Sequence, residues 1–161
     1  MSYRIGIGED VHRLVKNRKL ILGGAEIPFE AGLSGHSDAD VLVHAVMDAI
    51  IGALGLGDIG VHFPDTDAKY KDAPSIGLLN ETGKMLKQNG YEIVNIDSVI
   101  VAQNPRLSAY YGQMKANIAG ALGTDINNVS VKATTEEGLG YTGDGSGMAA
   151  RAVCLIKKTG H

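Results

Sequence analysis

Hydrophobic and polar positions recur along this chain with two periods, which predict a mixture of strands and helices. Short apolar or alternating runs predict strands at residues 4–8, 20–22, 96–102, 129–133 and 148–156. Apolar residues at helical spacing predict helices at residues 38–54, 74–89 and 107–122. Neither period is present in two further segments, which are predicted to be loops, at residues 27–36 and 55–72.

The order of these elements, β-β-α-α-β-α-β-β, indicates the fold class. It favours an α/β (α+β) sandwich, in which a mixed β-sheet carries helices on one face. No internal repeat or linker interrupts the sequence, so residues 1–161 are expected to form a single domain. The first helix is expected to be capped by Ser37, with Asp38 and Asp40 favourable in its first turn.

Composition and charge exclude several classes of protein. The net charge of −3 gives no sign of the basic surface of a nucleic-acid-binding protein. No apolar run reaches the roughly 18 residues that a membrane-spanning helix needs, and the first residues lack the pattern of a signal peptide. The single cysteine, Cys154, excludes an internal disulfide, fits a reducing compartment and is expected to be a buried structural thiol. We therefore expect a cytoplasmic protein that binds neither nucleic acid nor membrane.

Three polar residues in the first third of the chain could hold a metal ion. Asp10 and His12 are two positions apart at the end of the first predicted strand, so their side chains point to the same side. His44 lies in the first predicted helix, in a stripe with Asp40 and Asp48 at i, i+4 and i+8. The helix pattern alone favours a polar stripe that faces solvent, although two carboxylates could also orient a metal-binding imidazole.

Two nitrogens and one oxygen are a ligand set with more than one use. Asp10, His12 and His44 would suit a catalytic zinc ion, because they leave the fourth tetrahedral position open. The same ligands also serve non-haem iron, so the type of ligand cannot choose the metal.

Other segments could bind phosphate. Residues 36–38 precede the first predicted helix, where free N–H groups attract anions, although a simple capped helix start explains them equally well. Asp58, Asp65 and Asp67 could bind phosphate only through Mg²⁺, and as isolated residues they are typical of turns. Residues 132–138 combine hydroxyls with carboxylates that could contact a diphosphate and its magnesium ion.

The glycine-rich segment at residues 138–143 matches G-x-G-x-x-G, the fingerprint of dinucleotide-binding proteins. The next predicted element is a strand and not a helix, and too little chain follows for the expected acidic residue. We therefore reject a dinucleotide-binding fold.

Several short segments in a fixed order carry a resemblance to one family. They are Arg4-Ile5-Gly6, Asp10-Val11-His12, His36-Ser37-Asp38, His44, Gly57-Asp58-Ile59-Gly60, Phe63-Pro64-Asp65-Thr66-Asp67 and Lys132-Ala133-Thr134-Thr135. Over essentially its full length the chain resembles the 2-C-methyl-D-erythritol 2,4-cyclodiphosphate synthase family. No single segment is specific, but their order is, and it favours a functional His44 over a solvent-facing one.

The resemblance implies a homotrimer with active sites between adjacent subunits. It implies a zinc ion held by Asp10, His12 and His44, and a magnesium or manganese ion bound by Glu137 with the substrate phosphates. The implied substrate is 4-diphosphocytidyl-2-C-methyl-D-erythritol 2-phosphate, whose 2-phosphate attacks the β-phosphorus and expels CMP. This is a step of the non-mevalonate isoprenoid precursor pathway.

The resemblance also implies the roles of individual residues. The implied catalytic residues are His36, Asp58, Asp65 and Thr135. The methylerythritol and phosphate end of the substrate would contact Asp10, His12, His36, Ser37, Asp58, Ile59, Gly60, Phe63, Pro64, Asp65, Thr66 and Asp67. The cytidine end would contact Ala102, Gln103, Asn104, Pro105, Arg106, Ala133, Thr134 and Thr135. The substrate-binding set is completed by Glu137 and Tyr141.

Three positions depart from the pattern of the family. Glu9 stands where an aromatic residue is frequent, and Asp144 stands where many members carry an arginine. In the family these two positions border a cavity on the threefold axis that can hold a prenyl diphosphate, so two acidic residues predict a cavity that rejects diphosphates. Glu136 replaces a common threonine or serine, and the spacing before Leu139 favours Glu137 as the ligand of the second metal.

Three alternatives remain beside this interpretation. A non-haem iron oxygenase would use the same metal ligands, but the sequence offers no clear clamp for a 2-oxo acid. A trimeric, metal-stabilised binding protein would need a closed site with four ligands, whereas only three are convincing. A fused cytidylyltransferase, as in some relatives, does not fit into 161 residues, although a separate partner chain is compatible with the sequence.

Overall fold

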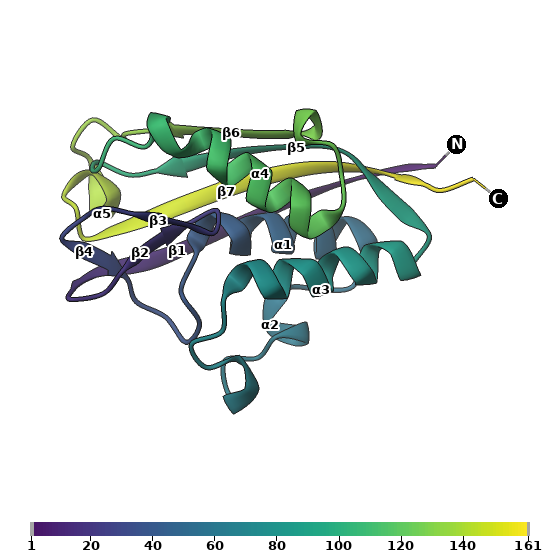
Figure 1. Cartoon of the computed structure of the whole chain (residues 1–161), viewed down its shortest axis with the longest axis horizontal. Helices are drawn as coiled ribbons and strands as arrows, with labels where there is room; N and C mark the ends of the chain where they lie inside the picture. The colour runs from purple at the N-terminus through teal and green to yellow at the C-terminus, as the bar shows by residue number, and fades with distance from the viewer. Residues whose placement is uncertain (1, 161) are drawn as a thin grey trace.

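The computed structural model describes residues 2–160 and is framed by one long twisted sheet (Figure 1). Its strands are β1 (Tyr3–Lys16), β4 (Ala31–Leu33), β5 (Tyr91–Val101), β6 (Val129–Thr134) and β7 (Gly147–Lys158). Within the described residues they lie in the order β4-β1-β7-β5-β6, with β5 and β6 parallel and the other pairs antiparallel. A separate hairpin joins β2 (Leu20–Leu22) to β3 (Ala25–Ile27).

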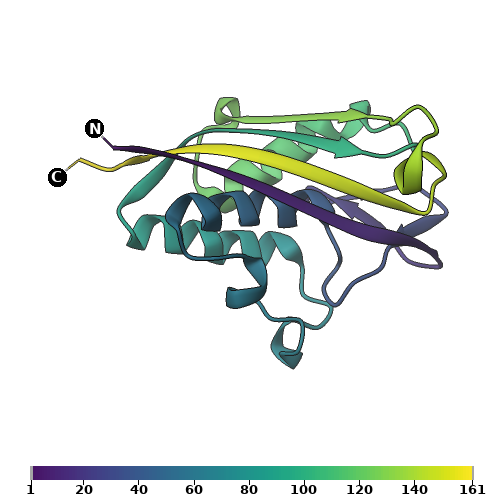
Figure 2. The same cartoon turned by 180° about the vertical axis from the view of Figure 1, so that it is seen from behind.

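The long helices lie on one face of this sheet, as Figures 1 and 2 show from opposite sides. They are α1 (Val41–Leu54), α3 (Ser75–Gln88) and α4 (Tyr111–Leu122). The connections contain the short helices α2 (Ile59–His62) and α5 (Gly140–Gly143) and the 3-10 turns η1 (Ala68–Tyr70), η2 (Ser108–Tyr110) and η3 (Ile126–Asn128). Helix α1 contacts β1 and β7 on one side and α3 on another, and almost all its side chains are buried.

Two glycines of β1 allow α1 to lie directly against the strand. A Cβ atom at Gly6 would lie 1.9 Å from the carbonyl oxygen of Ala49, and one at Gly8 would lie 2.0 Å from that of Ala45. A larger residue at either position would push the helix away from the sheet. Because His44 precedes Ala45, this close approach brings a helix side chain next to the middle of β1.

The predicted fold class, a mixed sheet with helices on one face, is confirmed, but several predicted boundaries are wrong. Strand β1 continues past residue 8 because it pairs with β7 as far as Arg13 and with β4 from there to Lys16. The predicted loop at 27–36 contains β4, and the predicted loop at 55–72 contains α2 and η1. The last two elements are each preceded by an aspartate whose side chain accepts a backbone N–H.

Helix α1 begins at Val41, so Ser37 is not its N-cap. Ala39 has a φ of +56°, which interrupts helical geometry before the helix starts. The carboxylate of Asp40 caps the helix by accepting the N–H of Val43 at 3.1 Å. Ser37 instead accepts the N–H of Ala39 within the preceding turn, and neither Asp38 nor Asp40 lies in the first turn.

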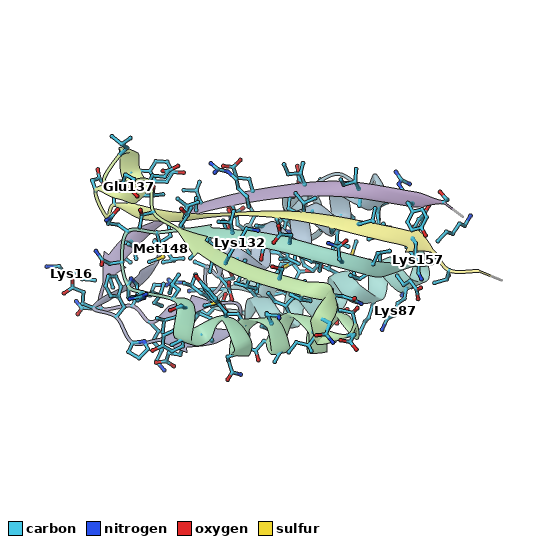
Figure 3. The ribbon with its side chains drawn as sticks, turned by 90° about the horizontal axis from the view of Figure 1, so that it is seen from above. Lys16, Lys87, Lys132, Glu137, Met148 and Lys157 are labelled. Carbon is cyan, nitrogen blue, oxygen red and sulfur yellow. The ribbon has the colours of Figure 1, made fainter. Side chains whose placement is uncertain are left out.

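The face of the sheet turned away from the helices exposes apolar side chains. Ile5 and Ile7 of β1 are each 71% exposed, and Val11 and Val153 lie on the same two paired strands. Figure 3 looks onto the sheet from above, with Lys157 near one end of β7. Exposed apolar side chains gathered on one face of a sheet are typical of a contact with another protein. Among residues 2–160, no helix has the length and the apolar character that crossing a membrane requires.

Candidate metal centre and substrate pockets

Asp10, His12 and His44 converge where α1 crosses β1. The Oδ2 atom of Asp10 lies 2.9 Å from Nε2 of His12 and 3.0 Å from Nδ1 of His44. The two imidazole nitrogens are 3.4 Å apart. A tetrahedral zinc ion with bonds of about 2.0–2.1 Å would separate its ligand atoms by roughly 3.4 Å, so these three atoms fit a metal with little movement. They are the group of potential metal ligands that the described residues bring together.

Hydrogen bonds hold both imidazoles so that one nitrogen of each ring faces Asp10. The Nδ1 atom of His12 lies 2.9 Å from the carbonyl oxygen of Ser34, and since a carbonyl only accepts, this nitrogen carries the proton. For His44 the outer nitrogen is Nε2, which lies 2.9 Å from the hydroxyl oxygen of Ser75 and 3.3 Å from that of Ser37. Each ring is thus oriented from behind, as metal-binding histidines are.

The predicted orienting residues of His44, Asp40 and Asp48, do not perform this task. Asp40 is fully buried and accepts the N–H groups of Gly23 and Gly24 at 2.9 and 2.7 Å, in addition to its cap bond. Burial raises the pKa of Asp40 to about 6, against the effect of these donors. Asp48 accepts the N–H of Ile59 at 3.1 Å. Asp40 and Asp48 therefore hydrogen-bond α1 to neighbouring segments. His44 is instead oriented by the hydroxyl of Ser75, which the sequence analysis did not identify.

Even without a metal ion, Asp10 and the histidines beside it shift the pKa values of Asp10 and His12. Burial opposes ionisation of Asp10, but hydrogen bonds and positive charge from His12 and His44 lower its pKa from 3.8 to about 2. Burial also opposes a charged His12, but the hydrogen bond and charge of Asp10 raise the pKa of His12 overall. A metal ion must therefore displace a proton that this carboxylate holds on the histidines.

A cavity of about 390 Å³ opens beside the metal ligands. Its wall includes seven further residues that the sequence predicts to contact substrate: His36, Ser37, Ile59, Gly60, Phe63, Pro64 and Asp65. Sequence reasoning missed Tyr70, whose ring packs edge-on against Phe63 with centroids 5.6 Å apart. Tyr70 lies in a segment without apolar periodicity, so no local pattern could have identified it.

Three other predicted residues lie near this cavity but outside its wall. Asp58 caps α2 by accepting the N–H of Val61 at 3.1 Å, and Asp67 caps η1 through the N–H of Lys69 at 2.9 Å. Thr66, between the two caps, is exposed. The expectation that residues 36–38 form the start of a helix is wrong, because α1 begins later and Asp38 binds the first residue of α3.

A second cavity, of about 350 Å³, lies at the carboxyl-terminal ends of β5 and β6. Its wall contains all eight residues predicted for the cytidine end: Ala102, Gln103, Asn104, Pro105, Arg106, Ala133, Thr134 and Thr135. Leu107, Ser108 and Tyr111 also line it and were not predicted. Among the described residues, the walls of this cavity and of the first one have no member in common.

Two adjacent glutamates in the loop after β6 have different surroundings. Glu136 accepts a hydrogen bond from the hydroxyl of Thr142, which is buried. Glu137 is exposed, has a φ of +54° and donates its N–H to the hydroxyl of Thr135 at 3.3 Å. Figure 3 shows Glu137 at one end of the sheet. Tyr141, in α5, is 47% exposed. The carboxylate of Glu137 is therefore the more exposed of the two, and its choice as the second-metal ligand stays a prediction.

The two acidic positions that depart from the family pattern have local partners. The Glu9 carboxylate lies 3.3 Å from Nε of Arg151 on the paired strand β7. Asp144 accepts the N–H of Ser146 at 2.8 Å as well as its hydroxyl proton, and these bonds lower the pKa of Asp144.

Known proteins resemble this chain over nearly all of its length. A model of the YgbB family matches residues 3–157. The 2-C-methyl-D-erythritol 2,4-cyclodiphosphate synthase of Clostridium novyi is 60% identical over 155 residues, which are 96% of this chain and 99% of that protein. The bifunctional IspDF of Campylobacter jejuni has a TM-score of 0.94 and 44% identity, covering 98% of this chain and 42% of that one. A CDP complex of IspF from Plasmodium falciparum has a TM-score of 0.86 and 31% identity, covering 99% of this chain and 98% of that one.

Proposed function

The chain belongs to the YgbB family, and we propose that it converts 4-diphosphocytidyl-2-C-methyl-D-erythritol 2-phosphate to 2-C-methyl-D-erythritol 2,4-cyclodiphosphate with release of CMP. It is thus a metal-dependent phosphorus–oxygen lyase of the non-mevalonate isoprenoid precursor pathway. The observation that carries the proposal is the metal-ligand group at the edge of a cavity, in a chain 60% identical to a synthase of that name.

The metal at Asp10, His12 and His44 is proposed to be zinc. Two imidazole nitrogens and one carboxylate oxygen, with an open position toward the cavity, are the donor set of a catalytic zinc site. When bound there, zinc supplies a Lewis acid and a template that neutralise phosphate charge. The second ion, Mg²⁺ or Mn²⁺, is proposed to bind Glu137 together with phosphate oxygens of the substrate, because hard cations prefer oxygen ligands.

The protein residues are proposed to act by position and by exclusion of water. Nucleophile and leaving group belong to one substrate, so catalysis needs the 2-phosphate aligned with the β-phosphorus and no protein nucleophile. His36 and Ser37 would contact the methylerythritol and phosphate end from the first cavity, together with Asp58, Asp65 and residues of the same loop. The ring of His36 lies 3.1 Å from the carbonyl oxygen of Asp67, which supports a fixed orientation in this role.

The cytidine end is proposed to bind in the second cavity. Residues 102–106 and Ala133 to Thr135 line it and would recognise the base and ribose. Thr135 would contact the diphosphate, since its hydroxyl lies next to Glu137 in the loop. A complex of a structural relative with CDP supports a nucleotide diphosphate as the ligand class.

A homotrimer is proposed because each chain carries two halves of a site with no lining residue in common. We propose that one substrate spans the first cavity of one chain and the second cavity of its neighbour. The exposed face of the sheet, with Ile5, Ile7 and Val11, offers an apolar surface for this contact. We further propose that residues 1–161 act as one domain in the cytoplasm, where the free Cys154 thiol would stay reduced.

Turnover of the proposed substrate tests this function directly. Purified protein, the diphosphocytidyl substrate, Zn²⁺ and Mg²⁺ are incubated together, and ³¹P NMR follows CMP and the cyclic product. Equal amounts of both products are expected, and none in His44→Ala. Consumption of dioxygen by an iron-loaded protein without CMP release would instead favour an oxygenase.

A further inference from the structure

A chain of hydrogen bonds runs from His44, away from the metal side, to a carboxylate that no role has so far explained. The outer nitrogen Nε2 of His44 lies 2.9 Å from the hydroxyl oxygen of Ser75, the first residue of α3. That hydroxyl is hydrogen-bonded to Oδ1 of Asp38. Ser75 is fully buried, so water does not compete for either bond. The three residues come from α1, α3 and the turn before α1, and none is adjacent to another in sequence.

The N–H donors around Asp38 determine which group donates and which accepts in each of these hydrogen bonds. Its Oδ2 atom accepts the N–H of Ser75 at 3.0 Å, and its Oδ1 atom accepts the N–H of Asp40 at 3.2 Å. Surrounded by donors, the carboxylate can only accept from the Ser75 hydroxyl as well. A hydroxyl has one proton, and when Ser75 gives it to Asp38 its oxygen can only accept from His44.

The direction of these hydrogen bonds determines which ring nitrogen of His44 has its lone pair free for a metal ion. A neutral imidazole that carries its proton on Nε2 has its lone pair on Nδ1. The Nδ1 atom of His44 is the one that lies 3.0 Å from Oδ2 of Asp10. We propose that Asp38 and Ser75 are positioning residues that, by this chain of donors, hold His44 in the one tautomer that can bind the metal. The inference rests on the metal centre proposed above and adds the residues that prepare it.

Ser37 does not replace Ser75 in this role. Its hydroxyl oxygen is farther from Nε2 of His44, at 3.3 Å, and already accepts the N–H of Ala39 at 3.2 Å. Among residues 2–160 the structure describes no carboxylate bonded to the Ser37 hydroxyl, whose other hydroxyl neighbour is Ser75, with the two oxygens 3.5 Å apart. Ser75, in contrast, is fastened by Asp38 through both its N–H and its hydroxyl.

Asp38→Asn is the sharpest variant, because it nearly preserves shape while adding donors. The new amide can give a proton to the Ser75 hydroxyl, which then gives its own proton to Nε2 of His44. The imidazole proton would then lie on Nδ1, and the metal side would lose its lone pair. Ser75→Ala removes the link altogether, and Ser75→Thr keeps the hydroxyl and tests rescue.

The experiment measures metal affinity and the tautomer separately. Metal-free wild type and variants are titrated with Zn²⁺ against a chelator, and long-range ¹H–¹⁵N NMR at neutral or higher pH identifies which nitrogen of His44 carries the proton. We expect Zn²⁺ affinity to fall about 10- to 100-fold in Asp38→Asn and Ser75→Ala. We expect Nε2 of His44 to carry a proton in wild type and to lack it in Asp38→Asn, where the proton stays on Nδ1 beside Asp10, and we expect partial rescue of affinity in Ser75→Thr.

Ser98→Ala is the matched control. Ser98 is also buried, on β5, and its hydroxyl donates to the carbonyl oxygen of Ser130, far from the metal ligands in the chain. Its variant should bind Zn²⁺ within about twofold of wild type, which separates a general loss of stability from loss of the chain. Unchanged affinity and an unchanged tautomer in folded Asp38→Asn and Ser75→Ala would overturn the inference. If His44→Ala binds Zn²⁺ as tightly as wild type, the proposed metal centre itself is wrong.

Discussion

The Nδ1 atom of His44 lies 3.0 Å from the carboxylate of Asp10, although 34 positions separate the two residues. Their meeting depends on how closely α1 approaches β1, and the absence of a side chain at Gly8 permits that approach. A Cβ atom at Gly8 would lie 2.0 Å from the carbonyl oxygen of Ala45, next to His44. The candidate metal centre therefore depends on a close contact between two backbone segments.

Gly8→Ala should damage both stability and metal binding. The added methyl group collides with backbone, which cannot rotate away, so the unfolding free energy should fall by about 1–3 kcal/mol or more. Zn²⁺ affinity should fall as well, because α1 moves with His44. Denaturant unfolding and chelator competition measure the two effects.

The control for this substitution is Gly120→Ala in α4. A Cβ atom at Gly120 meets no atom within 4 Å, and alanine is a better helix former by about 0.5–1 kcal/mol. This variant should be slightly more stable than wild type and should bind Zn²⁺ normally. Equal stability and affinity for Gly8→Ala and wild type would contradict the account of the backbone contact.

The fold class and the clustering of the three candidate metal ligands could be predicted because their signals are local or follow from the resemblance. The period of two in β1 places Asp10 and His12 on one side, which the distances of both from each other confirm. The resemblance, and not the helix pattern, selected His44. The predicted start of α1 was wrong because Ser37, Asp38 and Asp40 are all residue types that favour the N-cap position. The positive φ of Ala39 decides between them, and it cannot be read from the sequence.

Residues that act through distant partners could not be predicted. Ser75 and Asp38 are 37 positions apart, and nothing in either segment indicates the other. Tyr70 reaches the first cavity from an aperiodic loop by packing on Phe63. Such residues are defined by tertiary contacts, whereas the sequence displays periodicity, caps and short motifs.

The stability of the metal-free protein should depend on pH through Asp10. Its folded pKa is lowered to about 2 from 3.8 by the bonds and charges of His12 and His44, which outweigh burial. A lowered folded pKa stabilises the protein above the unfolded pKa, and this contribution is lost as the pH falls through the folded value. We expect wild type to lose unfolding free energy from about pH 4 to pH 2 through this group, and Asp10→Asn to lose less.

The pH dependence of stability that comes from His12 has the opposite sign. The pKa of His12 is raised overall, so its contribution is complete below 6.5 and is lost as the pH rises through the folded value. Urea unfolding of metal-free wild type and Asp10→Asn across pH 2 to 8 measures both windows. Parallel curves for the two proteins would show that the coupling between Asp10 and the histidines contributes nothing.

The two adjacent glutamates should have separable roles. Glu137→Ala should reduce turnover and raise the Mg²⁺ concentration needed for half-maximal activity, because its exposed carboxylate is the proposed ligand. Glu136→Ala should instead lower the unfolding free energy by about 1–3 kcal/mol, since it leaves the buried hydroxyl of Thr142 without its acceptor. Steady-state kinetics as a function of Mg²⁺ and thermal unfolding distinguish these results. The same shift in Mg²⁺ dependence for both variants would contradict the assignment.

Mixing two inactive variants can test whether an active site spans two subunits. His44→Ala removes the metal half of a site, and Thr135→Ala damages the cytidine half. If each site combines the first cavity of one chain with the second cavity of its neighbour, co-refolded mixed trimers contain some sites with both halves intact. With equal amounts and random assembly, about one quarter of wild-type activity should return, because each intact half is present in half of the chains. A mixture of His44→Ala with His12→Ala is the control and should remain inactive, since both changes lie in the same half. No recovery in the first mixture, with native mass spectrometry showing mixed trimers, would place each complete site within a single chain.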